Sequence, residues 1–261
     1  EYNIFLFFSK QMVYQIGGMF AVMATGEAIK AGVGAACRWD LANGYSNGDD
    51  HGMYSYGDEP GVTKFSPRPA FYYLYYMQKY LGDVMLNTTL KGSSDIKAYS
   101  SAFASGHYST ILANTGINTR IVRVNIDSGK VGERFYAYTL IGGTDVPADP
   151  LKPFSRKVYV NGEGPSEVAG GPLNYKNILA RSGMIGNEIL IEMPPFSVAY
   201  VLADTGSNHL VVNDTLYPVI TWNNPADIVY GTNLTSVQLN ATANMSGNFV
   251  YDPVSGTRLN A

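Results

Sequence analysis

The stretch Val33-Gly34-Ala35-Ala36-Cys37-Arg38-Trp39 decides how the first third of this chain is interpreted. Small and apolar residues dominate it, and such a run is typical of a short strand in a parallel sheet that is covered on both faces. Within that strand we expect Cys37 to be a small, buried apolar residue. Apolar residues recur at helical spacing over 11–31, so a helix is predicted directly before the strand.

A long loop and a second helix are predicted after the strand. The loop, 43–66, is rich in Gly, Asp, Asn and Tyr, and loops of this length in a compact domain are usually functional. The helix is predicted over 70–81, next to Pro69, which suits a first helical turn. Because this helix is aromatic on nearly every side, we expect neighbours to cover more than one of its faces. The order helix, strand, long loop, helix is typical of an α/β barrel or a doubly wound sheet.

The composition narrows the classes of function. Among 261 residues, 18 Lys and Arg face 21 Asp and Glu, so there is no basic excess to neutralise nucleic-acid phosphates. The single cysteine can form neither an intrachain disulfide nor a zinc-binding cluster. The uncharged part of the helix at 11–31 is shorter than the ~20 apolar residues that a membrane span needs. We therefore expect no nucleic acid, no membrane span, no metal and no cofactor.

The pattern of apolar and polar residues changes after Gly82. From 95 to 204, short runs that alternate with period two are separated by Gly, Pro and Asn, which is typical of half-buried antiparallel strands. About seven such runs indicate a β-sandwich. The expected strands are 96–102, 107–114, 120–124, 134–140, 157–160, 188–192 and 197–202. A linker follows at 205–216, and two further strand-like runs are 219–222 and 248–251.

Glu1 is the first candidate functional residue. A terminal Glu is usually a solvated chain end, but this one stands before a helix and before a strand that ends in Trp39. In an α/β barrel the catalytic residues lie at the carboxyl ends of strands. If Glu1 ends such a strand, it occupies a catalytic position.

The second group of candidates is Trp39, Asp40 and Asn43. A Trp at the carboxyl end of a strand can form an aromatic floor for a sugar ring, which has apolar faces and a polar edge. Asp40 or Asn43 could then accept hydrogen bonds from sugar hydroxyls. The competing interpretation is that Trp39 belongs to the core and Asp40 caps a turn.

The loop also carries Asp50 next to His51. A carboxylate beside an imidazole suggests a metal or an acid–base group. However, consecutive residues rarely point to one centre, and the spacing lacks the pattern of a calcium loop. A plain structural loop is the favoured interpretation, sugar contacts come second and a metal third.

These residues resemble a known family. Glu1-Tyr2-Asn3 resembles the end of barrel strand seven in clan A retaining glycoside hydrolases, where a T-E-[YW]-N type stretch carries the nucleophilic Glu. The run 33–39 is similar to strand eight, whose terminal Trp stacks under the sugar at the cleavage point. Such enzymes often carry a C-terminal β-sandwich that ends in a stretch like 193–202 here. Within the clan, the order of parts most resembles the β-agarase and porphyranase group, and 217–261 resembles part of a bacterial Ig-like repeat.

The resemblance implies a multidomain α/β plus all-β chain. It divides into an incomplete (β/α)8-barrel end at 1–90, an antiparallel β-sandwich at 91–204, the linker at 205–216 and a partial Ig-like β module at 217–261. It also implies a secreted or cell-surface protein whose substrate is a polysaccharide or oligosaccharide, for example an algal galactan such as agarose. Its remaining partner would be the preceding barrel portion of the same polypeptide.

The family mechanism implied by this resemblance needs two carboxylates. Glu1 would be the nucleophile, and the acid–base residue would be a Glu after an Asn at the end of strand four. Strands one to six have no counterpart in these 261 residues, so we expect no turnover by them alone. Two alternatives stay open: a non-catalytic carbohydrate-binding or adhesion protein, and, for 94–261, a scaffold without a ligand.

Overall fold

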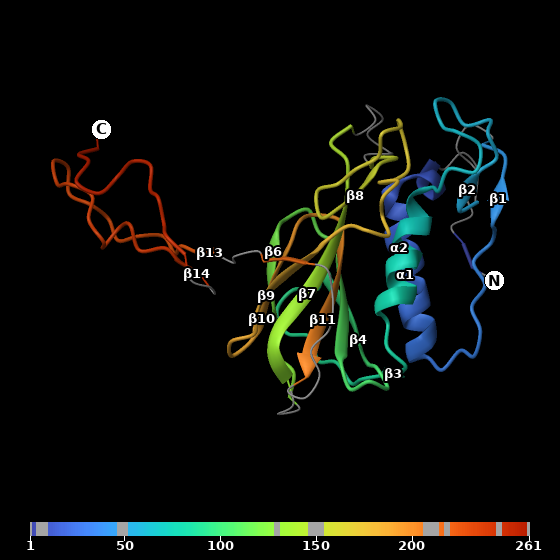
Figure 1. The fold of residues 1–261 in the computed structure, drawn as a ribbon, viewed down its shortest axis with the longest axis horizontal. Coiled ribbons are helices and arrows are strands. Elements are labelled where there is room, and N and C mark those ends of the chain that lie inside the picture. The colour runs from blue at the N-terminus through green and yellow to red at the C-terminus, as the bar shows by residue number, and fades with distance from the viewer. Residues whose placement is uncertain are drawn as a thin grey trace.

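The computed structural model describes residues 2–3, 10–45, 52–127, 131–145, 154–205, 214–216, 220–243 and 247–259. Its centre is a large, mainly antiparallel sheet with helices α1 (Gln15–Lys30) and α2 (Pro69–Tyr80) packed against one face (Figure 1). The described residues are therefore mostly β with two α-helices, as the sequence predicts. Among them, no helix is both long enough and apolar enough to cross a membrane.

Both predicted helices are present. The first is divided at Tyr14 into a short 3-10 helix, η1 (Lys10–Val13), and α1. Helix α2 begins at Pro69, in the first-turn position where a missing backbone N–H costs nothing. The aromatic residues of α2 are covered on more than one side, because the helix contacts both α1 and the sheet.

The large sheet has the strand order β12-β9-β7-β11-β5-β4-β3, with β8 also paired to β7. Strand β11 lies in its middle, and all nine of its residues are buried because both faces of the sheet are covered. The bounds of the strands are β3 (Val84–Met85), β4 (Ile96–Ala102), β5 (Tyr108–Asn114), β7 (Val131–Gly142), β8 (Val158–Val160), β9 (Ala180–Met184), β11 (Ser197–Thr205) and β12 (Asp214–Leu216).

The two faces of this sheet bury different sets of side chains. On the face toward the helices, tyrosines such as Tyr138 and Tyr200 pack with Tyr73 and Tyr76 of α2. On the opposite face, smaller aliphatic side chains pack against a two-stranded antiparallel sheet of β6 (Arg120–Val124) and β10 (Ile189–Met193). The strands predicted for the sandwich are thus present, and β9 is an addition that its sequence, Ala-Arg-Ser-Gly-Met, does not suggest.

The predicted buried strand at 33–39 is wrong. These residues form no strand, the stretch 33–37 is exposed, and Cys37 is exposed rather than buried. One isolated parallel bridge joins Tyr2 to Arg38. The physical reason is that a parallel strand of small residues needs cover on both faces, and in the described part of the chain nothing supplies it.

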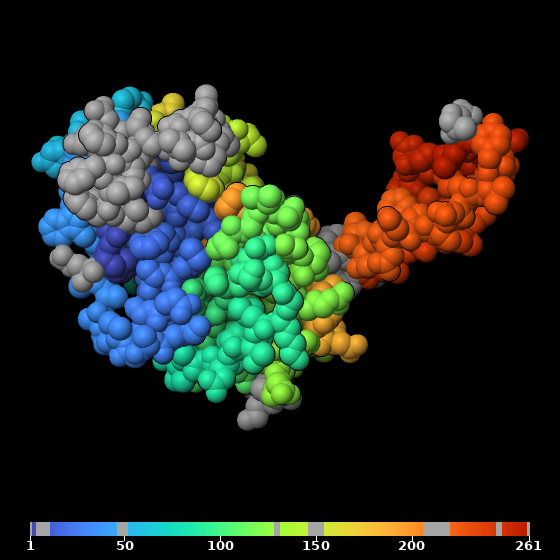
Figure 2. Space-filling model, turned by 180° about the vertical axis from the view of Figure 1, so that it is seen from behind, coloured from blue at the N-terminus to red at the C-terminus, as the bar shows by residue number. Residues whose placement is uncertain are grey.

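Residues 220–243 and 247–259, in the last part of the chain, extend away from the main body (Figures 1 and 2). Its strands β13 (Ile220–Thr221) and β14 (Thr242–Ala243) pair antiparallel. The predicted strand at 248–251 is not formed there. Among the described residues of this part, Leu234 is the hydrophobic residue that is buried. Trp222 is half exposed, and its ring lies beside the ring of Tyr251.

Candidate functional site

The candidate site begins where residues 2–3 meet residues 37–39. The backbone N–H of Tyr2 donates to the carbonyl of Cys37 at 3.0 Å, and the N–H of Trp39 donates to the carbonyl of Tyr2 at 3.2 Å. The Tyr2 hydroxyl lies 2.6 Å from the hydroxyl of Thr25, which ties this pair of segments to α1. Two neighbouring backbone segments thus run parallel at this point, as the ends of adjacent barrel strands would.

Trp39 lies at the end of this parallel bridge and is 51% exposed. Its carbonyl accepts a hydrogen bond from the side-chain amide of Asn3, and the peptide bond between Trp39 and Asp40 is cis. The competing interpretation of Trp39 as a core residue is wrong, because half of its surface is open to solvent. An exposed indole ring at this place can stack on a sugar ring.

Asp40 and Asn43 follow Trp39 on the same segment. The Asp40 carboxylate is partly buried, and its Oδ1 atom has no hydrogen-bond partner among the described residues. Asn43 has a structural contact, since its Oδ1 accepts from the backbone N–H of Gly52 at 3.2 Å. Asn43 Oδ1 is thus engaged within the protein, whereas Asp40 Oδ1 is a buried acceptor that solvent does not reach.

Two short strands hold this segment in place. Strand β1 (Ala42–Asn43) pairs parallel with β2 (Tyr54–Ser55). The carbonyls of Asp40 and Leu41 accept from the backbone N–H groups of Met53 and Tyr54, at 3.1 and 3.0 Å. Burial raises the pKa of Tyr54, and the nearby Tyr175 adds to the effect.

Three of the predicted site residues, Glu1, Asp50 and His51, lie outside the described residues. Trp39, Asp40 and Asn43 are brought together on one segment, with Asn3 beside Trp39. In the part of the chain that is described, no group of three or more His, Cys, Asp or Glu side chains is arranged to hold a metal ion.

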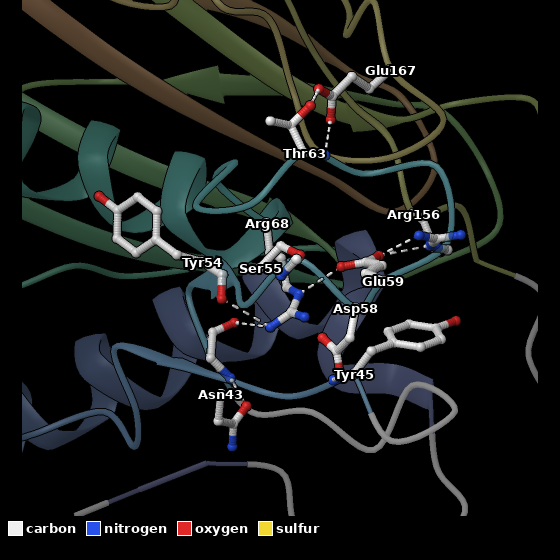
Figure 3. A network of polar contacts seen from close by, with 12 residues as sticks. Asn43, Tyr45, Tyr54, Ser55, Asp58, Glu59, Thr63, Arg68, Arg156 and Glu167 are labelled. Atoms are coloured by element: carbon white, nitrogen blue, oxygen red, sulfur yellow. Dashed lines mark hydrogen bonds and ion pairs between the residues drawn. The ribbon is translucent and has the colours of Figure 1, made fainter.

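A buried ionic network contacts the backbone at β2, the strand that pairs with β1 (Figure 3). The sequence does not predict this network. The Arg68 Nε atom donates to Glu59 Oε2 at 2.8 Å, and the other oxygen of Glu59 accepts from Arg156. Arg68 Nη1 also donates to the carbonyls of Tyr54 and Gly52, at 3.1 and 3.4 Å. The one feature of the sequence that points to the network is Arg68 itself, a charged residue between Pro67 and Pro69 at the start of a buried helix.

One further contact lies within the long loop, and another joins the loop to a distant part of the chain (Figure 3). The Asp58 carboxylate accepts from the backbone N–H of Tyr45 at 2.8 Å. The Glu167 carboxylate accepts from the hydroxyl and the N–H of Thr63, at 2.6 and 3.2 Å. The loop predicted at 43–66 is thus anchored at its described parts.

A mainly apolar groove of about 470 Å³ lies beside the candidate site. Its walls come from α1 and α2 on one side and from the segment around β1 and β2 on the other. The lining residues are Thr25, Leu41, Met53, Tyr54, Phe71, Leu74, Tyr75, Met77, Gln78 and Leu81.

Comparison with protein-family models gives no match, and no curated protein matches the chain. Solved structures do match. The thermostable GH51 alpha-L-arabinofuranosidase from Thermotoga petrophila RKU-1 has a TM-score of 0.53 at 13% identity, over 77% of this chain and 41% of its own. The alpha-L-arabinofuranosidase from Thermotoga maritima, in its arabinose complex, has a TM-score of 0.52 at 12% identity over the same shares, 77% and 41%.

A third structure, the arabinose-bound MgGH51 a-L-arabinofuranosidase, has a TM-score of 0.53 at 16% identity over 73% of this chain and 27% of its own. At such identities the matches show a shared fold. This chain spans less than half the length of each of these structures. It therefore shares its fold with a part of each of these three structures.

Proposed function

We propose that this chain is the C-terminal portion of a secreted retaining glycoside hydrolase that cleaves glycosidic bonds in a polysaccharide. The observation that carries the proposal is the parallel bridge between Tyr2 and Arg38, which leads directly to the exposed ring of Trp39. This is the arrangement that the ends of barrel strands seven and eight would have. The fold shared with three arabinofuranosidases supports the same conclusion.

In this proposal Glu1 is the nucleophile that attacks the anomeric carbon. A second carboxyl group, about 5–5.5 Å away, protonates the leaving oxygen and later activates the water that releases the sugar. Trp39 stacks under the sugar ring, and Asp40 and Asn43 bind its hydroxyls. Asp50 and His51 belong to the loop that shapes the same cleft.

The second carboxyl group belongs to the preceding barrel portion of the same polypeptide, which we propose as the partner of residues 1–90. Two surfaces support this. The stretch 33–37 is exposed although it is small and apolar, and Leu41 is 66% exposed at the edge of the apolar groove beside α1 and α2. Packing of further barrel elements would bury both surfaces and remove apolar area from water.

The remaining parts of the proposal concern the rest of the chain and the substrate. Residues 91–204 form the accessory β-sandwich, 205–216 a linker and 217–261 part of an Ig-like module. Two substrate classes are supported. The order of parts resembles enzymes of algal galactans such as agarose, whereas the solved structures with the same fold are arabinofuranosidases.

The test is an activity assay on the polypeptide that contains the preceding barrel portion together with these residues. Glu1→Gln should abolish release of reducing sugar from agarose or arabinoxylan, and Trp39→Ala should lower it by about tenfold or more. Glu188→Gln, directly before β10 of the two-stranded sheet, is the matched control and should leave activity unchanged. Cleavage retained by Glu1→Gln, or turnover by the 261 residues alone, would contradict the proposal.

A non-catalytic carbohydrate-binding role is the second candidate. The observation that favours it is that the described residues are mostly β while the exposed Trp39 ring can bind a sugar without any catalytic group. Two results together would favour this role over catalysis. Insoluble polysaccharides would pull down the chain, and the longer polypeptide would cleave none of them.

A further inference from the structure

A pair of exposed aromatic rings lies on the hairpin that follows β2. Tyr56 and Phe65 are 56% and 58% exposed, and their ring centroids are 6.5 Å apart in an edge-to-face arrangement. The ammonium group of Lys64 lies 5.0 Å from each centroid. These three side chains, Tyr56, Lys64 and Phe65, are called the hairpin platform below.

The backbone holds the platform in an unusual conformation. Phe65 has a φ of +63°, a left-handed value that is costly for a bulky side chain and persists only where the surroundings impose it. Its N–H donates to the carbonyl of Ser55 at 2.7 Å, and the N–H of Ser55 donates to the carbonyl of Ser66 at 3.0 Å. The fold therefore keeps this ring directed to solvent at a conformational cost.

Side-chain contacts fix the rest of the hairpin. Glu59, near its tip, is buried between Arg68 and Arg156, and Thr63 is bonded to Glu167 of the connection between β8 and β9. The platform thus projects from a braced loop (Figure 3 shows these supporting contacts). A braced binding group loses little conformational freedom when a ligand arrives.

The chemistry of the platform suits a sugar ring. The apolar C–H face of a pyranose can pack on an aromatic ring, and a hydroxyl at its edge can accept a hydrogen bond from the ammonium group of Lys64. A protein partner is a poorer fit. Two rings of at most ~250 Å² each fall far short of the ~1,200 Å² that a specific protein interface buries.

We propose that the hairpin platform is a sugar-binding subsite that holds one ring of a polysaccharide chain, separately from Trp39. This inference rests on the proposed function. It is supported by continuity of the backbone, because the hairpin is the direct extension of β2, and residues 53–54 at its base are bonded to Asp40 and Leu41. The platform and the segment after Trp39 therefore belong to one braced unit, along which a long substrate can be bound at two places.

The experiment measures binding of the 261-residue chain to soluble arabinoxylan, agarose oligosaccharides and cello-oligosaccharides by affinity electrophoresis and calorimetry. Phe65→Gly and Tyr56→Ala should each weaken binding of the bound polysaccharide by about tenfold. Glycine adopts a positive φ without strain, so Phe65→Gly should keep the thermal unfolding temperature within a few degrees. Tyr230→Ala, which removes a ring that is 73% exposed on the C-terminal segment, is the matched control and should not change binding.

Unchanged affinity in both platform variants would overturn the inference, and so would the absence of binding to every polysaccharide tested. Either result leaves cleavage by the longer polypeptide as a separate question. Conversely, if Glu1→Gln retains cleavage while the platform variants lose binding, the proposed catalytic role of Glu1 fails and the sugar-binding subsite stands.

Discussion

Glu59 is bonded to Arg68 at 2.8 Å, and the two side chains are 1% and 2% exposed. The same carboxylate accepts from Arg156, which precedes β8. This one buried anion therefore joins the loop after β2, the start of α2 and the large sheet.

The first prediction concerns that anion. Glu59→Gln keeps the size of the side chain but removes the buried negative charge that pairs with Arg68 and Arg156. We expect the free energy of unfolding to fall by about 3–5 kcal/mol, measured by urea denaturation of the chain. Glu167→Gln, which alters a surface contact to Thr63, is the control and should cost within about 1 kcal/mol. An equal loss of unfolding free energy in the two variants would show that the buried Glu59 ion pair contributes no more to stability than the surface contact of Glu167 does.

The second prediction concerns the glycines of α1. A Cβ atom at Gly18 would lie 2.2 Å from the ring of Tyr73, and one at Gly26 would lie 2.5 Å from the ring of Tyr99. Alanine normally stabilises a helix interior relative to glycine by up to ~1 kcal/mol, but here overpacking reverses the sign. We expect Gly18→Ala and Gly26→Ala each to destabilise by about 1–3 kcal/mol.

Thermal unfolding measures this effect. Gly34→Ala is the control, because no atom lies within 4 Å of a Cβ built there. It should change the stability by less than about 0.5 kcal/mol. An increase in unfolding temperature in the two α1 variants would refute the close approach of α1 to the tyrosine-lined core.

The third prediction concerns alkaline pH. Burial raises the pKa of Tyr73 and Tyr200 well above their ordinary values. Above pH ~10 the unfolded chain loses these phenolic protons while the folded chain keeps them, so stability present below that pH is lost as the pH rises. Each tyrosine should contribute a decline of about 1.4 kcal/mol per pH unit.

Urea denaturation between pH 8 and pH 11 measures the decline. Tyr73→Phe should reduce the slope of unfolding free energy against pH by the contribution of one tyrosine. The variant also loses the hydrogen bond of 2.9 Å that the Tyr73 hydroxyl donates to Gln15. That loss costs about 1 kcal/mol at every pH and so leaves the slope unaffected. An identical slope in the variant would contradict the assignment of the decline to buried tyrosines.

The fourth prediction concerns acidic pH. The hydrogen bond from Arg120 to Asp95, 2.5 Å long, is the main cause that lowers the pKa of that carboxyl, while burial acts in the opposite direction. A lowered pKa stabilises the fold above the unfolded value of ~3.9, and this stability is lost as the pH falls through the folded value. Asp95→Asn should therefore flatten the loss of stability below pH 4 in acid titrations followed by circular dichroism. If the variant instead lost stability more steeply below pH 4, the ionised Asp95 carboxylate would not be stabilising the fold.

Local pattern predicted much of the fold. Strands 96–102 and 120–124 match β4 and β6 residue for residue. In β6 partly buried and exposed side chains alternate with period two, whereas β4 buries neighbouring residues in both clusters and is recognisable from the turn residues that bound it. Helix α2 was predictable because Pro69 and a run of aromatic residues mark both its start and its burial. Strand β9 was missed, since its small and polar residues are ordered by pairing with β7, a partner far along the chain.

The candidate site was predictable only in part. Trp39 and Asp40 were selected from their position after an apolar run, although that run forms no strand among the described residues. The Glu59–Arg68 ion pair and the hairpin platform were not selected. In the sequence these residues look like ordinary charged and aromatic members of a polar loop, and only burial or a positive φ distinguishes them.

Both helices and most of the strands could be predicted from the residues alone, because each of these elements depends on side chains within a few positions of one another. The packing of distant segments is what gives the helices and the sheet one tyrosine-rich core, buries Arg68 and leaves Trp39 and Phe65 exposed. Burial depends on which distant segments cover a side chain, and that cover is a property of the whole packed chain rather than of any local pattern.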